Sequence, residues 1–419
     1  MLVASAAESS LARADGVAGP ALAAWYPTYN QDIQNVAVHG SLCLNDPPAM
    51  PADRQSLCEP PALETLGTGR YAVSIENGAP FPVIDNDSGF AAFVTTVGTN
   101  AKCFEEGTTF SGTTLQSLVH CVDPVSGADV DAPFSWSYRA DSLDFPQDPI
   151  YTPTGAYARV ERDGTLVPEE SYNPLELHDD DVRVERTAAG SYTVTFLDMN
   201  PLDASLEPTL SPYSVLVQKT CTNDTAGGAE DDGCFRAVCV PSTWTPGDFE
   251  TWDTTIEVRC FAADGSARDT GFRVSFGDEG FIEQGNWDGG YRYGWTDWSI
   301  APDAEGCHEA PEVMSNSQHE TPPTFFPGLP VTTCRTDVGT YQVNFFEENI
   351  SIYSADGANV VVSSRETDGT YCNVGEILCS EFNGACGIPG TTPNARITVT
   401  CFDSSGNPAD SRFTMNMTY

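Results

Sequence analysis

The chain has 419 residues, of which 60 are acidic and 19 are lysine or arginine, and its formal net charge is −41. A surface this acidic repels nucleic acids and anionic membranes, so we expect neither as a partner. No apolar run reaches the ~18 residues that a membrane-spanning helix needs, and we expect no membrane span.

The first 19 residues carry none of the patterns that recur later, and we expect an N-terminal arm over 1–19. Its apolar stretch, MLVASAA, ends at Glu8 and has no basic residues before it. It is therefore too short for the apolar core of a complete secretion signal. Two interpretations remain open, a free arm and the remnant of a signal peptide.

The first repeat extends over residues 20–138 and contains three patterns in a fixed order. GRYAVSI at 69–75 and FAAFVTT at 90–96 come first, and HCVDPVSGADVDAPFSWSY at 120–138 follows. In the last phrase, apolar residues alternate with polar ones on both sides of a turn rich in glycine and aspartate. This pattern predicts two strands joined as a β-hairpin with one buried face.

Two further copies follow, over residues 139–276 and 277–419. The second contains GSYTVTF, YSVLVQK and RCFAADGSARDTGFRVSF, and the third contains GTYQVNF, NVVVSSR and TCFDSSGNPADSRFTMNM. Helical patterns are scarce, and short strands separated by frequent turns are typical of antiparallel sandwiches. We therefore expect an all-β chain, a tandem array of three antiparallel β-sandwich domains of Ig/fibronectin-like type, stapled by disulfides.

The repeated pattern, Gly-x-Tyr-x-Val-x-Phe followed by Val-x-Cys-Phe-x3-Gly-x3-Asp-x2-Phe, resembles a tandem β-sandwich repeat of uncharacterised secreted bacterial proteins. The matching stretches are GSYTVTF with VRCFAADGSARDTGF and GTYQVNF with VTCFDSSGNPADSRF. The first repeat departs from the pattern, because HCVDPVSGADVDAPF lacks the Cys-Phe pair and carries an insertion. The resemblance implies secretion and implies no particular activity.

The chain contains 14 cysteines and no C-x-x-C pair, which favours disulfides made in an oxidising compartment. We therefore expect an extracellular or cell-surface protein. The cysteine after each middle strand is expected to pair with the cysteine of the last phrase: Cys103–Cys121, Cys239–Cys260 and Cys372–Cys401. The others are expected to close local loops: Cys43–Cys58, Cys221–Cys234, Cys307–Cys334 and Cys379–Cys386. Cys234 is an alternative to Cys239 as the partner of Cys260.

An aromatic stretch, NWDGGYRYGWTDW at 286–298, is the one candidate binding surface. Its aromatic residues are Trp287, Tyr291, Tyr293, Trp295 and Trp298. Exposed aromatic side chains flanked by polar residues bind sugar rings or partner proteins. The alternation of the three central aromatic residues fits a core strand with one buried face equally well, so both interpretations remain open.

Catalytic motifs are not found in the sequence, and we expect no enzyme. It contains neither H-E-x-x-H, nor G-x-S-x-G, nor a Gly-rich nucleotide loop between a strand and a helix. DNDSG at 85–89 places Asp85 and Asp87 at the spacing of a calcium loop but lacks the later glutamate. A solvated turn explains this motif as well, so we expect no cofactor and keep calcium as a weak candidate.

These observations together favour a non-catalytic extracellular structural protein, the building block of a surface filament, sheath, coat or layer. The alternative is a secreted adhesin or carbohydrate-binding protein, with a polysaccharide as its partner. Self-assembly is expected through the N-terminal arm or through sheet edges. The last predicted strand, RFTMNMTY at 412–419, is the expected open edge.

Overall fold

The computed structural model describes residues 26–28, 37–39, 62–76, 90–111, 114–140, 155–173, 181–197, 214–221, 232–245, 253–277, 293–297, 302–309, 332–345, 359–366, 368–378 and 395–418. Within these ranges the chain forms antiparallel sheets and one short helix, which confirms the predicted all-β class. No helix in the same ranges is long and apolar enough to cross a membrane. The predicted N-terminal arm, 1–19, lies outside the described residues.

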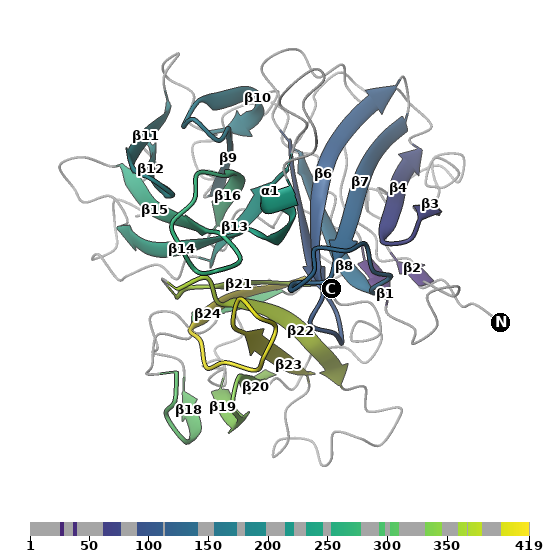
Figure 1. The fold of residues 1–419 in the computed structure, drawn as a ribbon, viewed down its shortest axis with the longest axis vertical. Helices are drawn as coiled ribbons and strands as arrows, with labels where there is room; N and C mark the ends of the chain where they lie inside the picture. The colour runs from purple at the N-terminus through teal and green to yellow at the C-terminus, as the bar shows by residue number, and fades with distance from the viewer. Residues whose placement is uncertain are drawn as a thin grey trace, which may run out of the picture.

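Six strands recur in the same order in three successive segments of the chain (Figure 1). In the first segment they are β3 (Ala62–Gly67), β4 (Arg70–Glu76), β5 (Phe90–Thr96), β6 (Lys102–Ser111), β7 (Thr114–Val122) and β8 (Phe134–Ala140). They form one sheet in the order β3-β4-β7-β6 and a second sheet of β5 and β8. Before them, β1 (Tyr26–Thr28) pairs with β2 (Ala37–His39).

The second segment repeats this arrangement and extends it. Its strands are β9 (Gly155–Val160), β10 (Leu166–Tyr172), β11 (Val182–Ala188), β12 (Ser191–Phe196), β13 (Ser214–Thr220), β14 (Val238–Thr245), β15 (Thr254–Phe261) and β16 (Gly271–Gly277). The sheet orders are β11-β12-β15-β14 and β10-β9-β16-β13. The only helix in the described residues, α1 (Asp232–Arg236), precedes β14.

The third segment has the same six strands with two additions. Its strands are β17 (Tyr293–Asp297), β18 (Gly306–Glu309), β19 (Thr332–Asp337), β20 (Thr340–Phe345), β21 (Asn359–Ser364), β22 (Tyr371–Leu378), β23 (Ala395–Phe402) and β24 (Phe413–Thr418). They form sheets in the orders β18-β19-β20-β23-β22 and β17-β24-β21.

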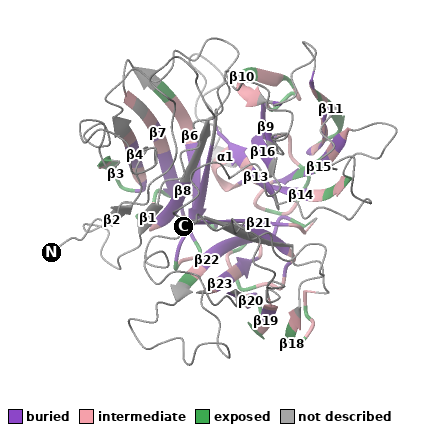
Figure 2. Cartoon of the chain, turned by 180° about the vertical axis from the view of Figure 1, so that it is seen from behind, coloured by how far each residue is buried: buried purple, intermediate pink, exposed green. Residues whose placement is uncertain are grey.

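Each segment buries a core between its two sheets (Figure 2). In the first segment, Tyr71 and Val119 of one sheet pack in the same cluster as Val94 and Trp136 of the other. The alternation in the sequence is seen again in the burial of side chains, because half-buried and fully buried residues alternate along β12. Apolar side chains at every second position therefore supply the inner faces of both sheets.

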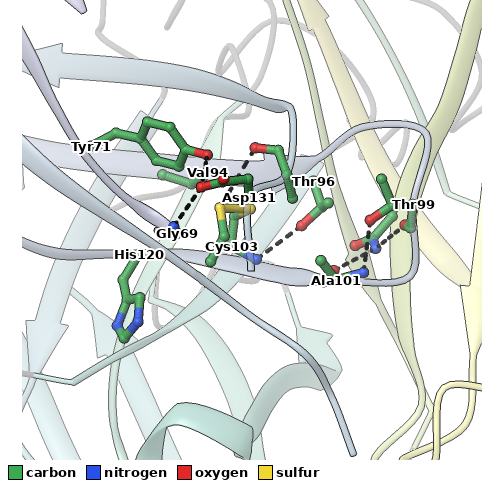
Figure 3. Close-up of a disulfide and its surroundings, with 12 residues drawn as sticks. Gly69, Tyr71, Val94, Thr96, Thr99, Ala101, Cys103, His120 and Asp131 are labelled. Carbon is green, nitrogen blue, oxygen red and sulfur yellow. Dashed lines mark hydrogen bonds between the residues drawn. A yellow bond between two sulfur atoms is a disulfide. The ribbon is translucent and has the colours of Figure 1, made fainter. Parts of the chain in front are cut away.

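The residues that recur in the sequence phrases form one cluster in each segment. In the second segment, the Gly190 N–H donates to Asp269 Oδ1 at 2.8 Å, and the Tyr192 hydroxyl lies 3.4 Å from the same oxygen. The Tyr192 ring packs on Phe272 with 5.0 Å between centroids. The corresponding residues are Gly69, Tyr71 and Asp131 in the first segment (Figure 3) and Gly339, Tyr341 and Asp410 in the third. The phrases are therefore repeated because their residues hold the two sheets together.

The prediction that the last phrase forms a hairpin is wrong. β15 pairs with β12 and β14, whereas β16 pairs with β9 and β13, so the turn between them carries the chain from one sheet to the other. The hydrogen bond from Gly190 to Asp269 anchors the end of this turn to the first sheet. Alternation identifies a strand and its buried face, but it does not identify the neighbouring strand.

The prediction that the final strand is an open edge is also wrong. β24 lies between β17 and β21 and pairs with both. Residues 293–297 form the strand that covers the edge of β24, and the alternation of aromatic residues in them did not predict that they pair with β24. Head-to-tail assembly through β24 is therefore not available to the folded chain.

Five of the seven predicted disulfides are present in the structure: Cys103–Cys121, Cys221–Cys234, Cys239–Cys260, Cys307–Cys334 and Cys372–Cys401. Cys43–Cys58 and Cys379–Cys386 involve residues outside the described ranges. Cys103 and Cys121 lie directly opposite each other on β6 and β7, with 4.0 Å between their Cα atoms (Figure 3). The bridge therefore joins neighbouring strands of one sheet.

The three segments pack around a common centre, where β5, β13 and β21 meet. Phe93, Leu216 and Val361, which occupy equivalent positions on these strands, form one buried cluster with Tyr157 of β9. Figure 1 shows the segments as three bodies around this centre, with the first in blue, the second in teal and the third in green to yellow. The shared apolar cluster joins the three segments into one molecule.

Hydrogen bonds between the segments close a ring. Gln218 of the second segment binds the main chain of Val94 in the first, at 2.7 and 3.0 Å. Ser363 of the third segment binds the main chain of Val217 in the second, at 3.0 and 3.1 Å. Thr95 of the first segment accepts the N–H of Val362 in the third at 3.2 Å. Each donor or acceptor side chain occupies the same strand position, so the arrangement approximates threefold symmetry.

Candidate functional site

The residues predicted from the sequence as binding or metal candidates lie largely outside the described ranges: Trp287, Tyr291, Trp298, Asp85 and Asp87. Tyr293 and Trp295 belong to β17, for which the structure describes the backbone. This agrees with the strand that their alternation predicts. Among the described residues, no group of three or more histidine, cysteine or acidic side chains gathers at metal-binding distance.

A cavity of about 80 Å³ lies between the three segments and is the candidate site. All three segments contribute to its walls through the middle strands β5, β13 and β21 and the strands β6, β14 and β22 that follow them. The lining includes Lys102 of the first segment and Lys219 of the second, the only two lysines in the chain. Threonine, serine, glutamine and asparagine supply its other polar groups.

Both lysines are buried, each with about 6% of its surface exposed. The Lys102 ammonium donates to the Arg236 carbonyl oxygen at 3.1 Å and lies 4.3 Å from the centroid of the Tyr371 ring. Lys102 therefore combines a main-chain acceptor with the face of an aromatic ring, and Lys219 does the same.

The Lys219 ammonium donates to the carbonyl oxygens of Cys234 and Phe235. It lies 4.0 Å from the centroid of the Phe104 ring, which belongs to the first segment. Carbonyl groups at the end of a helix carry partial negative charge and attract cations. Even so, neither lysine contacts a carboxylate among the described residues, and the charge of Asp403 is the smallest of the effects on Lys102.

Burial shifts the titration of both groups. Desolvation, with a smaller contribution from the positive charge of Arg236, lowers the pKa of Lys102 from 10.5 to about 7. Desolvation and the charge of Lys102 hold the pKa of Lys219 well below its usual value. Transfer of an ammonium group into a low-dielectric site disfavours its charged form. Burial therefore favours the neutral form of each amine, and a negative group in the cavity would favour the charged form.

The helix α1 supplies the three acceptors and is wedged against the first segment. Its position is fixed by the Cys221–Cys234 disulfide, which closes a 13-residue separation. The Phe235 ring packs against Phe104 and His120 of the first segment, with centroids 5.9 and 5.0 Å apart. This contact holds the carbonyl groups of α1 at the cavity.

The connection between β7 and β8 of the first segment also contacts α1. Arg236 donates to the Val125 carbonyl oxygen at 3.0 Å, across the boundary between the first two segments. His120, buried behind Phe235, lies 2.8 Å from Asp129 and 2.9 Å from Glu106. The two carboxylates on its ring nitrogens orient the imidazole that supports α1.

A buried ion network lies elsewhere on the same boundary. Arg273 of the second segment, fully buried, contacts Glu105 of the first and Glu170 of its own. Arg159 contacts Glu170 as well, and Glu161 at 3.0 Å. Removing one member would leave an uncompensated buried charge, so this network fixes how the two segments sit against each other.

The chemistry of the cavity follows from its two amines. A protonated lysine in this setting binds an anion or a hydrogen-bond acceptor. An unprotonated one is a nucleophile. Among the described residues, the candidate site is therefore a pair of buried amines.

The sequence analysis did not identify the two lysines as a site. The available signal was their position. Lys219 ends the apolar strand pattern YSVLVQK, and Lys102 directly precedes a disulfide cysteine at the start of a strand. All other cationic side chains of this type in the chain are arginines, and both lysines are buried.

Comparison of the chain with protein-family models, with curated proteins and with solved structures found no match.

Proposed function

We propose that the chain is a non-catalytic extracellular structural protein, the building block of a surface coat, layer, sheath or filament. In this proposal the three segments are Ig/fibronectin-like β-sandwich domains with boundaries at 20–138, 139–276 and 277–419. Five disulfides between described cysteines support a location in an oxidising compartment, outside the cytoplasm.

The observation that carries the proposal is the closed ring of contacts between the segments. Thr95, Gln218 and Ser363 each bind the main chain of the next segment, and an apolar cluster fills the centre. Buried polar groups satisfied in this way fix one relative orientation. A rigid body of constant shape is what a repeating assembly requires.

The outer strands support a layer in preference to a filament. Among the described strands, β3, β11 and β18 end their sheets, and Figure 1 places them at the outside of the molecule, one on each segment. Unpaired strand edges are templates for pairing with another chain. Three such edges, one on each segment, would connect each molecule to several neighbours and build a sheet of molecules.

Sedimentation and electron microscopy of the purified full chain at rising concentration test the proposal. We expect concentration-dependent assemblies with a regular repeat. Leu66 of β3, 53% exposed, offers an edge variant, and Leu66→Lys should weaken assembly while leaving the melting temperature unchanged. A chain that stays monomeric at millimolar concentration in calcium, high salt and low salt would refute the proposal.

A carbohydrate-binding adhesin is the second candidate, and the position of β17 supports it. β17 is the end strand of its sheet in the order β17-β24-β21, so Tyr293–Asp297, the described part of the aromatic stretch, lies along a sheet edge. A glycan array with the immobilised full chain separates the two functions. Binding that is lost in Trp295→Ala would favour the adhesin.

A further inference from the structure

Several arginines of the described residues contact carboxylates, as Arg186 does with Asp269 at 2.7 Å and Arg335 with Asp410 at 2.8 Å. Lys102, Lys219 and Arg236 differ, because in the described part of the chain their hydrogen-bond acceptors are main-chain carbonyl oxygens. The use of main-chain acceptors by these three cations is unexpected, because the chain has 60 acidic residues.

The two lysines also lie close together, at the end of α1. Lys102 bonds the carbonyl oxygen of Arg236, and Lys219 bonds the carbonyl oxygens of the two residues before it. Both ammonium groups are buried and repel each other, because little solvent screens their charges, whereas Arg236 is only half-buried. The molecule can relieve the repulsion by losing protons or by admitting a counter-ion.

The geometry of the ammonium groups leaves room for a counter-ion. An ammonium group has three N–H donors, and among the described residues Lys102 donates one hydrogen bond, to Arg236 O. Both lysines line a cavity of about 80 Å³, and roughly 10–15 Å³ of such volume holds one water molecule. The space therefore suits a small ion with one or two waters.

We propose that the central cavity binds a small inorganic anion of halide size between the ammonium groups of Lys102 and Lys219. The anion accepts hydrogen bonds from the ammonium N–H groups that do not donate to the carbonyl oxygens of α1, and it balances the positive charges of the two lysines. Because the walls come from all three segments, the bound anion stabilises the closed ring. A strongly acidic surface does not prevent binding, since salt screens the surface charges but hardly screens the buried ones.

Anomalous diffraction locates the anion directly. Crystals of the full chain are grown or soaked in sodium bromide, and data are collected at the bromine absorption edge. We expect an anomalous peak in the cavity within hydrogen-bonding distance of Lys102 or Lys219. A cavity without a peak, in crystals that show bromide elsewhere on the surface, would overturn the proposal.

Thermal unfolding in solution provides the independent measurement. The full chain is melted while chloride replaces gluconate at constant ionic strength, since gluconate is too large for the cavity. We expect the melting temperature to rise with the logarithm of chloride concentration once the site approaches saturation. Lys102→Met and Lys219→Met should each lose most of this rise.

Arg412→Met is the matched control, because Arg412 is 40% exposed and pairs with Glu366 at 3.5 Å, away from the cavity. This variant should keep the full chloride dependence. An equal chloride dependence in all four proteins would contradict the proposal. If a lysine variant does not fold, the bromide map of the unaltered chain still decides.

Discussion

One carboxylate in each segment binds the residues that recur most regularly in the sequence. Asp269 accepts hydrogen bonds from Arg186 and Gly190, and these lower its pKa against the opposing effect of burial. In the third segment, Asp410 accepts hydrogen bonds from the corresponding residues, Arg335 and Gly339. Asp131 lacks the arginine, because Thr65 stands opposite Tyr71 where the other segments have arginine opposite tyrosine.

This difference predicts that Thr65→Arg stabilises the first segment. The new guanidinium would pair with Asp131 as Arg335 pairs with Asp410, and the melting temperature should rise by about 1–2 °C. The double variant Thr65→Arg with Asp131→Asn is the control. An equal rise in the double variant would show that the gain does not come from the ion pair.

The glycine of the same cluster is required by its backbone. Gly69 has φ +69°, and a Cβ atom there would lie 2.5 Å from the Cys121 carbonyl oxygen and 2.8 Å from the Val130 nitrogen. Gly69→Ala should therefore lower the free energy of unfolding by about 2–4 kcal/mol, measured by urea titration. Gly67, two residues earlier, has no atom within 4 Å of its Cβ position, and Gly67→Ala should leave the stability unchanged or slightly higher.

The buried lysines predict how stability depends on pH in gluconate buffers. Between pH 7 and 10 the folded chain holds Lys102 neutral while the unfolded chain keeps it protonated, so the unfolded state binds more protons. The free energy of unfolding should therefore rise with pH across this window, by up to about 1 kcal/mol per unit, and Lys219 adds in the same direction. Asp403 and Arg236 are the charged groups that act on Lys102.

Buried tyrosines should make the free energy of unfolding fall again at higher pH. Burial raises the pKa of Tyr71 and Tyr192 to about 12, so above pH 10 the folded chain binds more protons than the unfolded chain and stability falls. Chemical denaturation at intervals of half a pH unit measures both limbs. Lys102→Met should flatten the rising limb and leave the falling one. A rising limb of unchanged slope would contradict the assignment.

At the scale of strands, the sequence identified the elements better than their neighbours. Alternating apolar residues predicted β12, β15 and β16, and the positions of the cysteines predicted the bridges between described residues. The partners of β16 and β24 could not be read from alternation, because a strand's period is the same whichever strand lies beside it. The cavity was missed for a related reason, since it belongs to no single repeat.

The bridges between neighbouring strands make a prediction at this scale. The Cys239→Ala and Cys260→Ala double variant should lose about 3 kcal/mol of unfolding free energy, the chain-entropy value for a separation of 21 residues. Urea titration of the variant against the unaltered chain measures the loss. Peptide mapping should recover the five observed pairs together with Cys43–Cys58 and Cys379–Cys386. A bridge between segments would contradict the scheme.

At the scale of the whole molecule, the central cluster should determine whether the segments melt together. Phe93 is buried at the centre and contacts the other segments, so Phe93→Ala should cost about 3–5 kcal/mol and uncouple them. We expect calorimetry to show a single transition in the unaltered chain and separate transitions in Phe93→Ala. Val73→Ala, inside the core of the first segment, is the control that weakens one segment without opening the centre.

The ring also imposes an order in time on the folding of the chain. Asn100 in the first segment bonds Gly406 in the third across 306 residues, and Val97 of the first segment belongs to the core cluster of the third. A polypeptide made from its N-terminus must therefore leave these groups without partners until its last strands exist. Contacts so distant in sequence form slowly, and the waiting chain exposes apolar surface that favours aggregation. The final segment cannot complete its own interior until it docks on the first.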